Sequence, residues 1–244
     1  MGKFISNFNT TAELASFSAT TACSKPHVSF TKDNGKAHFF DHDWIEIGGV
    51  KWATMNIGAT GVTDYGLYFQ WGDTQGYTSS QVGSGSGQKY FGWADYKYGN
   101  GTSSPGATGM TKYNSTDGKT VLEISDDAVR ANWGGSWRLP TTEEFVALGY
   151  AVNSAWTSSY TGSGVAGLVL TEKTDSSKVL FFPAVGYAST GSMYGVGSNG
   201  YYWSSSLSTS DMQNAYRLYF SSGAVLWQND SNRYRGFAAR GVLG

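Results

Sequence analysis

Residues 200–244 hold the side chains of this chain that are best suited to molecular recognition. Four of its six arginines lie here beside seven Tyr and Trp residues, whereas all eleven lysines lie at or before Lys178. Tyr, Trp and Arg are enriched at binding hot spots because they give large contact area and hydrogen bonds at little cost in rotamer freedom. This composition predicts a ligand-binding surface. A buried aromatic edge of a β-core with serine turns is the alternative.

The order of residues within this segment predicts which side chains reach a ligand. Two-residue alternation in 215–220 places Tyr216, Leu218 and Phe220 on a packed face and Arg217 with Tyr219 on a presented face. Across the next turn Val225 is expected inward and Leu226 outward, followed by an irregular, displayed stretch at 227–231. The candidate ligand-binding residues are Ser208, Ser210, Asp211, Arg217, Tyr219, Leu226, Trp227, Gln228, Asp230, Ser231, Tyr234 and Arg235.

Two further arginines in this segment have a structural interpretation. Arg233 and Arg240 flank the apolar run at 236–239, where an arginine can extend along apolar surface and tie loop carbonyl groups together. Direct contact with a ligand is the alternative role for both.

Residue types that carry catalysis or bind metals are sparse. The single cysteine, Cys23, excludes an internal disulfide and a multi-thiolate zinc site. Asp41-His42-Asp43 could supply metal ligands, but a solvated turn is the favoured interpretation. The serine run 204–206 has no histidine after it, so no nucleophile–base pair is evident. We therefore expect a protein without catalysis, cofactor or metal.

Charge and hydropathy restrict the partners. The formal net charge is −1 and the lysines are scattered, so no basic stripe is present to bind nucleic acid. No apolar run approaches the roughly 20 residues that span a bilayer, so direct membrane insertion is not expected. The first residues lack the layout of a signal peptide, so we expect a soluble protein whose export is absent or whose leader has been trimmed.

Local patterns divide the chain into an N-terminal appendage, residues 1–43, and a larger domain, residues 44–244. Capping chemistry predicts a short helix near 10–19. Asn34-Gly35 between 27–30 and 36–40 predicts a β-hairpin, since this dipeptide readily adopts the positive φ of a tight turn.

The sequence patterns of the domain predict an α+β fold. Two strands are expected around Gly48-Gly49, and acidic or hydroxyl caps open two short helices that run to about Trp133 and past Leu148. The remaining predicted elements are a strand at 65–71, a hairpin of 168–171 with 179–183, and a hairpin of 215–220 with 224–227. The total is eight to ten strands against two or three short helices.

Glycine, serine and threonine dominate residues 76–119, broken by aromatic groups such as 90–93 and 96–98. Long surface loops held down by aromatic anchors are expected here. Residues 79–88 could equally be disordered.

The order of several motifs resembles a known family. These motifs are WATMNIGA from Trp52, YGLYFQWGD from Tyr65, ANWGGSWRLPTTEEF from Ala131, GYYWSSS from Gly200 and GFAARGV from Gly236. Over residues 44–244 the chain resembles the C-type-lectin-like proteins of gut Bacteroidetes and their phages, in the branch with the formylglycine-generating-enzyme type of fold. The resemblance implies short antiparallel sheets, a few short helices and long ordered loops.

Within that branch, the C-terminal segment resembles the variable region of target proteins of diversity-generating retroelements. This implies a fixed scaffold with a changeable ligand-binding surface, displayed on a virion tail or a bacterial cell surface and directed to a protein or glycan on another cell. An ordinary surface domain of the same fold, or a structural subunit of a tail or filament that assembles through this face, is the alternative. The oligomeric state is not fixed by the sequence.

The enzymes and sugar-binding members of these families need residues that this chain lacks. Oxidation of a sulfatase cysteine requires redox-active cysteines, whereas Cys23 lies outside the matching region. Calcium-dependent sugar binding in C-type lectins uses Glu-Pro-Asn or Gln-Pro-Asp followed by Trp-Asn-Asp, and none of these triplets occurs. The resemblance therefore favours a binding module over an enzyme.

Overall fold

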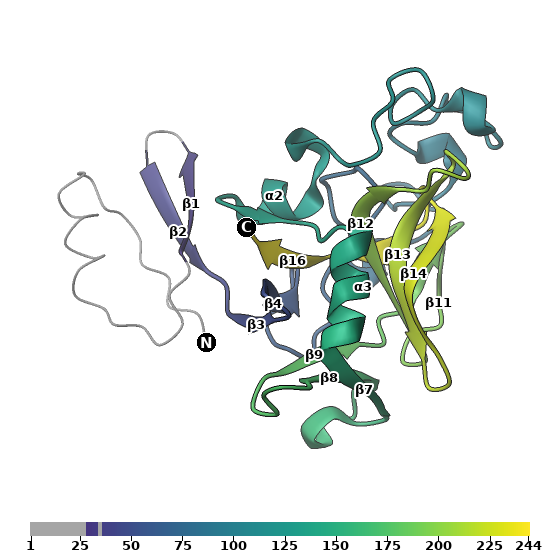
Figure 1. Cartoon of the computed structure of the whole chain (residues 1–244). Helices are drawn as coiled ribbons and strands as arrows, with labels where there is room; N and C mark the ends of the chain where they lie inside the picture. Colours follow the sequence, from purple (N-terminus) through teal and green to yellow (C-terminus); the bar gives the residue numbers. More distant parts are fainter. Residues whose placement is uncertain (1–27, 34–35) are drawn as a thin grey trace.

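The computed structural model describes residues 28–33 and 36–244, in which strands dominate over helices. In the described part of the chain the helices α2 and α3 lie among short β-sheets (Figure 1). Strand pairs are antiparallel except for one contact between Tyr202 and Ala238. The α+β class predicted from the sequence is therefore confirmed, while the helix expected near 10–19 lies outside the described residues.

The largest sheet of the described residues contains most strands of the C-terminal segment 200–244. Its strands, in spatial order, are β14 (Val225–Asn232), β13 (Asn214–Ser221), β12 (Asn199–Leu207), β15 (Phe237–Ala238) and β5 (Tyr68–Phe69). The hairpin of β13 and β14 confirms the hairpin predicted for 215–220 with 224–227. The prediction of an irregular stretch at 227–231 is wrong, because strand pairing continues to Asn232. The strand expected at 65–71 forms only as the two residues of β5.

A second sheet brings together distant parts of the chain. It contains β3 (Trp44–Ile47), β4 (Val50–Asn56), β16 (Arg240–Leu243) and β6 (Trp137–Arg138), with β16 between β4 and β6. Val242 lies opposite Trp52, so the C-terminal strand pairs with the strand that follows the predicted Gly48-Gly49 turn. This pairing places the last strand of the domain beside one of its first strands.

Three antiparallel hairpin units complete the strands. A three-stranded sheet holds β7 (Val152–Thr157), β8 (Gly167–Glu172) and β9 (Val179–Pro183). A short hairpin joins β10 (Tyr187–Ser189) to β11 (Ser192–Tyr194), and the predicted N-terminal hairpin is present as β1 (Val28–Asp33) and β2 (Lys36–Asp41).

Both predicted helices of the domain are present and capped as their sequences indicate. In α2 (Ala128–Trp133) the Asp127 carboxylate accepts hydrogen bonds from the first-turn amides of Val129 and Arg130. In α3 (Thr142–Ala151) Thr141 and Glu144 form a reciprocal capping box. Each cap satisfies amide groups that the first helical turn leaves without partners. Short 3-10 turns lie at Ser79–Gln81, Trp93–Asp95, Ala107–Gly109, Ile124–Asp126 and Tyr160–Gly162.

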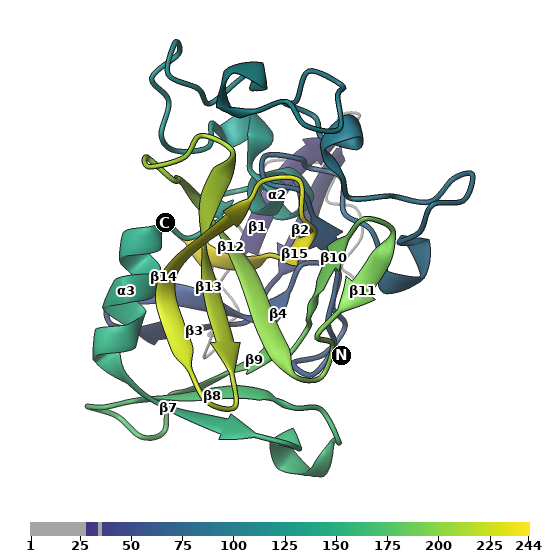
Figure 2. The same ribbon diagram turned by 90° about the vertical axis from the view of Figure 1, so that its right-hand side faces the viewer.

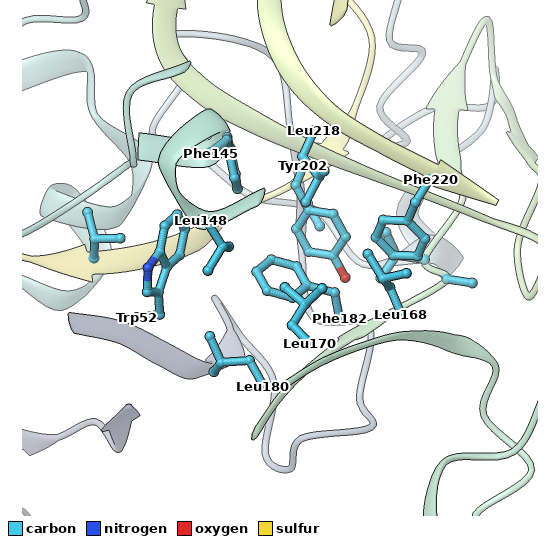
Figure 3. Packing of buried hydrophobic residues seen from close by; sticks show 14 of the residues in the cluster. Trp52, Phe145, Leu148, Leu168, Leu170, Leu180, Phe182, Tyr202, Leu218 and Phe220 are labelled. Carbon is cyan, nitrogen blue, oxygen red and sulfur yellow. The ribbon is translucent and has the colours of Figure 1, made fainter. Parts of the chain in front are cut away.

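Two hydrophobic clusters pack on opposite sides of the five-stranded sheet. Figure 3 shows the first, where Tyr202, Leu218 and Phe220 of the sheet meet α3, β8 and β9. In the second, Trp203 packs its ring 4.1 Å from that of Phe237 and donates from Nε1 to the Phe69 carbonyl at 2.8 Å. The sheet is therefore covered on both sides near β12 and β15.

Arg240 joins three strands from the interior. Its side chain is fully buried and donates to Asn56 Oδ1 at 2.8 Å, to the Ala53 carbonyl at 2.9 Å and to the Phe181 carbonyl at 3.1 Å. Burial lowers the pKa of Arg240 to about 10. The structural role predicted for this arginine is confirmed.

Arg233 fixes the long loops by hydrogen bonds from the interior, as Arg240 fixes the strands. It is fully buried and donates to Tyr96 Oη, to the carbonyls of Lys112 and Tyr113, and to the carbonyl of Met212, each at 2.8 or 2.9 Å. Residues 76–119 are thereby ordered against the sheet with little regular structure of their own. Within the segment 79–88, Ser79–Gln81 form a 3-10 turn and Val82 forms a β-bridge with Lys89, so the alternative of disorder is wrong.

Replacing Arg233 by Met should loosen the loops first. The change leaves several buried acceptors without donors, which costs about 3–5 kcal/mol of unfolding free energy. Amide hydrogen exchange should accelerate most over 96–122, while β12 and β13 stay protected. Lys119→Met, at a side chain that is 40% exposed, is the matched control. Uniform acceleration over the whole domain would show that the loops are not separately anchored.

Asp126 anchors the same loops through charge. Its carboxylate is 6% exposed, lies 3.1 Å from Lys97 Nζ, contacts Lys112 Nζ, and accepts from Tyr113 Oη at 2.6 Å. Burial by itself raises the pKa of Asp126, but the hydrogen bonds from Lys112 and Tyr113 outweigh it and hold the pKa well below its usual range.

This depressed pKa predicts acid-sensitive stability. Below a pH near 4 the unfolded chain binds a proton at Asp126 that the folded protein still excludes, so the stabilisation is complete above that pH and is lost as pH falls. Asp126→Asn should cost about 3 kcal/mol at pH 7. In urea unfolding, the gap between wild type and this variant should shrink steadily from pH 5 to pH 2. A constant gap would mean that charge at Asp126 is unimportant.

Candidate ligand-binding face

Strand register sorts the C-terminal side chains between the two sides of the five-stranded sheet. Residues directly opposite each other on paired strands point to the same side. Tyr219 lies opposite both Tyr201 and Leu226, whereas Phe220 lies opposite Val225. The first group therefore points away from α3, and Val225 packs inward against the first cluster as predicted.

The outward group forms the centre of what we term the aromatic–arginine face. In Figure 2 this side of β12, β13 and β14 faces the viewer, with the β10–β11 hairpin beside it and the long loops above. The face comprises Tyr187, Tyr194, Tyr201, Arg217, Tyr219, Leu226 and Arg235. Tyr194 and Leu226 are each 42% exposed, and the other five are half-buried. Neighbouring rings order this surface before any partner arrives.

Arg217 lies at the centre of the face among aromatic rings. Its guanidinium carbon is 4.7 Å from the ring centre of Tyr201, 5.1 Å from Tyr219 and 5.5 Å from Phe237. Nε and Nη1 are buried and form no hydrogen bond with the described residues. This desolvation lowers the pKa of Arg217 to about 10.

Arg235 extends the positive charge towards the β10–β11 hairpin. Its guanidinium carbon lies 5.4 Å from the Tyr187 ring centre, and Nη1 donates to Ser231 Oγ at 3.2 Å. Tyr187 in turn stacks on Tyr194 with centroids 5.3 Å apart and packs 4.8 Å from Tyr201. A continuous row of rings therefore links the hairpin to the sheet.

Trp227 lies on the opposite side of the sheet, so its expected display is wrong. It packs against the first cluster, and a Cβ added to Gly149 of α3 would lie 2.7 Å from the Trp227 ring. The absence of a side chain at Gly149 makes room for the indole. A two-for-one mismatch in register between 217–219 and 226–229 places Trp227 inward and leaves Gln228 exposed.

The serine and aspartate candidates form structure around the loop between β12 and β13. Ser208 is fully buried, and its Oγ donates to Asp230 Oδ2 at 2.9 Å and lies 3.0 Å from Ser210 Oγ. Asp211 accepts from the Gln213 amide at 2.9 Å, as in a tight turn. Only Ser210 of this group is exposed. Asp230 lies opposite Tyr216, which places it on the side of the sheet away from Arg217.

Ser231 and Tyr234 border the aromatic–arginine face and are largely covered. Ser231 is 7% exposed and accepts the hydrogen bond from Arg235. Tyr234 packs its ring 4.8 Å from that of Trp93 in the long loops. The structure therefore brings together four of the predicted residues, namely Arg217, Tyr219, Leu226 and Arg235, and disperses the rest.

The sequence-based selection missed Tyr187, Tyr194 and Tyr201. Tyr201 could have been found from its two-residue spacing to Trp203 and from the pairing expected with the next strand. The two hairpin tyrosines flank Thr190-Gly191, both with positive φ, a turn that returns the chain over two or three residues. This turn precedes residue 200, so it lies outside the C-terminal segment from which the candidate ligand-binding residues were chosen.

The groups considered for catalysis have structural contacts. Ser204, Ser205 and Ser206 are buried and bond to main-chain groups of Tyr216, Pro140 and Thr142 respectively. The His42 ring stacks 4.1 Å from that of Trp133, so the interpretation of a solvated turn is wrong for this residue. Within the described part of the chain no cluster of three metal-ligating side chains occurs, and no helix is long and apolar enough to cross a membrane.

Comparisons with known proteins match only part of the chain. Residues 170–240 match the family model described as "Domain of unknown function (DUF8237)". No curated protein and no solved structure matches the chain. The matched region runs from within β8 through β15, so it includes every residue of the aromatic–arginine face.

The division between the two sides of the sheet predicts opposite results for adjacent residues. Trp227→Ala should lower the free energy of unfolding by about 2 kcal/mol, because the ring is half-buried against α3. Leu226→Ser should change it by no more than about 0.5 kcal/mol. Urea unfolding at 25 °C measures both. Similar losses from the two variants would contradict the register.

Proposed function

We propose that this protein is a non-catalytic ligand-binding module whose aromatic–arginine face contacts the ligand. The observation that carries the proposal is the composition of that face. Four tyrosines and two arginines gather there with solvent access, and these residue types dominate binding hot spots. Stacked neighbours hold the rings in place, which reduces the entropy lost on binding.

The opposite side of the same strands supports this role. Leu218 and Phe220 alternate with Arg217 and Tyr219 along β13 and are fully buried in the first cluster. A substitution on the outward side therefore leaves the core contacts in place. A binding surface that tolerates change without unfolding its scaffold needs this separation.

The finer fold and family are part of the proposal. We assign the domain to the C-type-lectin-like fold of the formylglycine-generating-enzyme type, and to the variable proteins of diversity-generating retroelements. In support, the motifs that carry the resemblance form scaffold elements: β4, α2 with β6, β12, and β15 with β16. The proposed ligand-facing positions on β13 and β14 lie between the last two motifs.

In this role the protein is displayed on a virion tail or a bacterial cell surface and binds a protein or glycan of another cell, with no cofactor and no chemical step. A structural subunit would use the same face for assembly. Sedimentation at tens of micromolar distinguishes the two, since a subunit self-associates there. A nearby reverse transcriptase gene with a template repeat that differs at adenines would independently support diversification.

Binding to cells tests the proposed face. Labelled protein should bind cells of gut Bacteroidetes in flow cytometry, and Tyr219→Ala or Arg235→Ala should weaken binding at least tenfold, the loss typical of a hot spot. Melting temperatures should stay within a few degrees of wild type.

Exposed residues elsewhere provide the controls. Tyr150→Ala on α3 and Ile124→Ser, at side chains 79% and 68% exposed, should leave cell binding unchanged. Equal losses from control and face variants would place the binding surface elsewhere. Unfolding of the face variants would identify these strands as core.

A further inference from the structure

We propose that the aromatic–arginine face recognises an acidic segment of a protein, with an Asp or Glu carboxylate of the partner paired to Arg217. The inference rests on the proposed function and adds the chemistry of the ligand. Fewer of the hydrogen-bond donors of Arg217 are paired than those of the fully buried Arg233 and Arg240.

Arg217 is held in the free protein without hydrogen-bond acceptors. Nε and Nη1 are both buried and unpaired among the described residues, and three aromatic rings surround the guanidinium. Aromatic faces attract a cation, but they do not replace the planar acceptors that an arginine fork matches. The residue is half-buried, so a rotation of its side chain brings the fork to the surface, and such rotamer changes are common at interfaces.

The charge of Arg217 also has no ion-pair partner among the described residues. Arg235, the other arginine of the face, has a buried Nε without a partner and donates only to Ser231. Neither arginine forms an ion pair with a described residue. Asp230, the acidic group whose charge acts on Arg217, is engaged by Ser208 instead. The face therefore presents two positive charges to its partner.

A carboxylate satisfies these requirements together. It is planar, accepts two parallel hydrogen bonds from one arginine, and supplies the missing negative charge. A neutral ligand leaves the charge uncompensated.

The surroundings favour a protein as the source of the carboxylate. Leu226 lies beside Tyr219, and Tyr194 stacks on Tyr187 at the other end of the face; both are substantially exposed. These side chains suit the apolar residues that surround a hot spot in protein interfaces, where Tyr and Arg anchors meet apolar contacts. The expected partner segment therefore has Asp or Glu flanked by aliphatic or aromatic residues.

A phage-displayed library of random heptapeptides tests the inference. Selection on the wild-type protein should enrich peptides with Asp or Glu next to an apolar residue. Changing that acid to its amide in a synthetic selected peptide should weaken binding about 10- to 100-fold by calorimetry, the effect of losing a charge-assisted pair. Arg217→Met should cause a similar loss, and Arg217→Lys should restore only part of it, because lysine lacks the planar fork.

Several outcomes would overturn the inference. The folding control is the melting temperature of Arg217→Met, which should equal or exceed that of wild type because a desolvated charge is removed. Peptides that lose binding with Tyr219→Ala but contain no acid would preserve the proposed function and refute the carboxylate. Peptides insensitive to every face variant would refute both. Two results would refute an acidic protein segment as the partner. One is binding of the protein to acidic sugars on a glycan array when no peptide is selected, and the other is competition for the face by a second copy of this chain.

Discussion

Buried guanidinium groups hold this fold together. Arg233 and Arg240 are both fully buried, and neither forms an ion pair with the residues that the structure describes. Burying a charge is costly unless its donors are satisfied, and here oxygen atoms of the backbone and of uncharged side chains satisfy them. Each arginine needs acceptors from segments far apart in the sequence, so it fixes those segments relative to one another. Arg240 fixes the strands that close the domain, and Arg233 fixes the long loops that border the aromatic–arginine face.

That anchoring determines which part of the five-stranded sheet stays open as the proposed binding surface. Helix α3 covers one side of β12, β13 and β14, while the loops held by Arg233 cover the other side near β15. The part left open is limited to the outward residues of β13 and β14, the neighbouring Tyr201 and the β10–β11 hairpin. The size and position of the aromatic–arginine face are thus set by how far the loops held by Arg233 extend over this side of the sheet.

Local signals made much of the fold predictable, and long-range packing made the rest unpredictable. The caps at Asp127 and Thr141 and the alternation in 215–220 act within a few residues, so the sequence reveals them directly. The extent of β14 depends on a register mismatch with β13, and the inward turn of Trp227 depends on the space at Gly149, far away in sequence. For the same reason four of twelve candidate ligand residues came together on one face, while the tyrosines of the β10–β11 hairpin were missed.

Three of the four arginines of the C-terminal segment, Arg217, Arg233 and Arg240, also show how the proposed binding residue differs from a structural one. Arg233 and Arg240 each donate from all three guanidinium nitrogens, whereas Arg217 keeps two buried nitrogens unpaired. Folding alone favours an apolar side chain at such a position, because replacing a desolvated charge by a well-packed hydrophobic group is often neutral or stabilising. Local choices that conflict with the fold are expected at functional sites. In the proposed function Arg217 is such a choice: it lies in the middle of the aromatic–arginine face, and its unpaired donors are the feature that a partner can supply with acceptors.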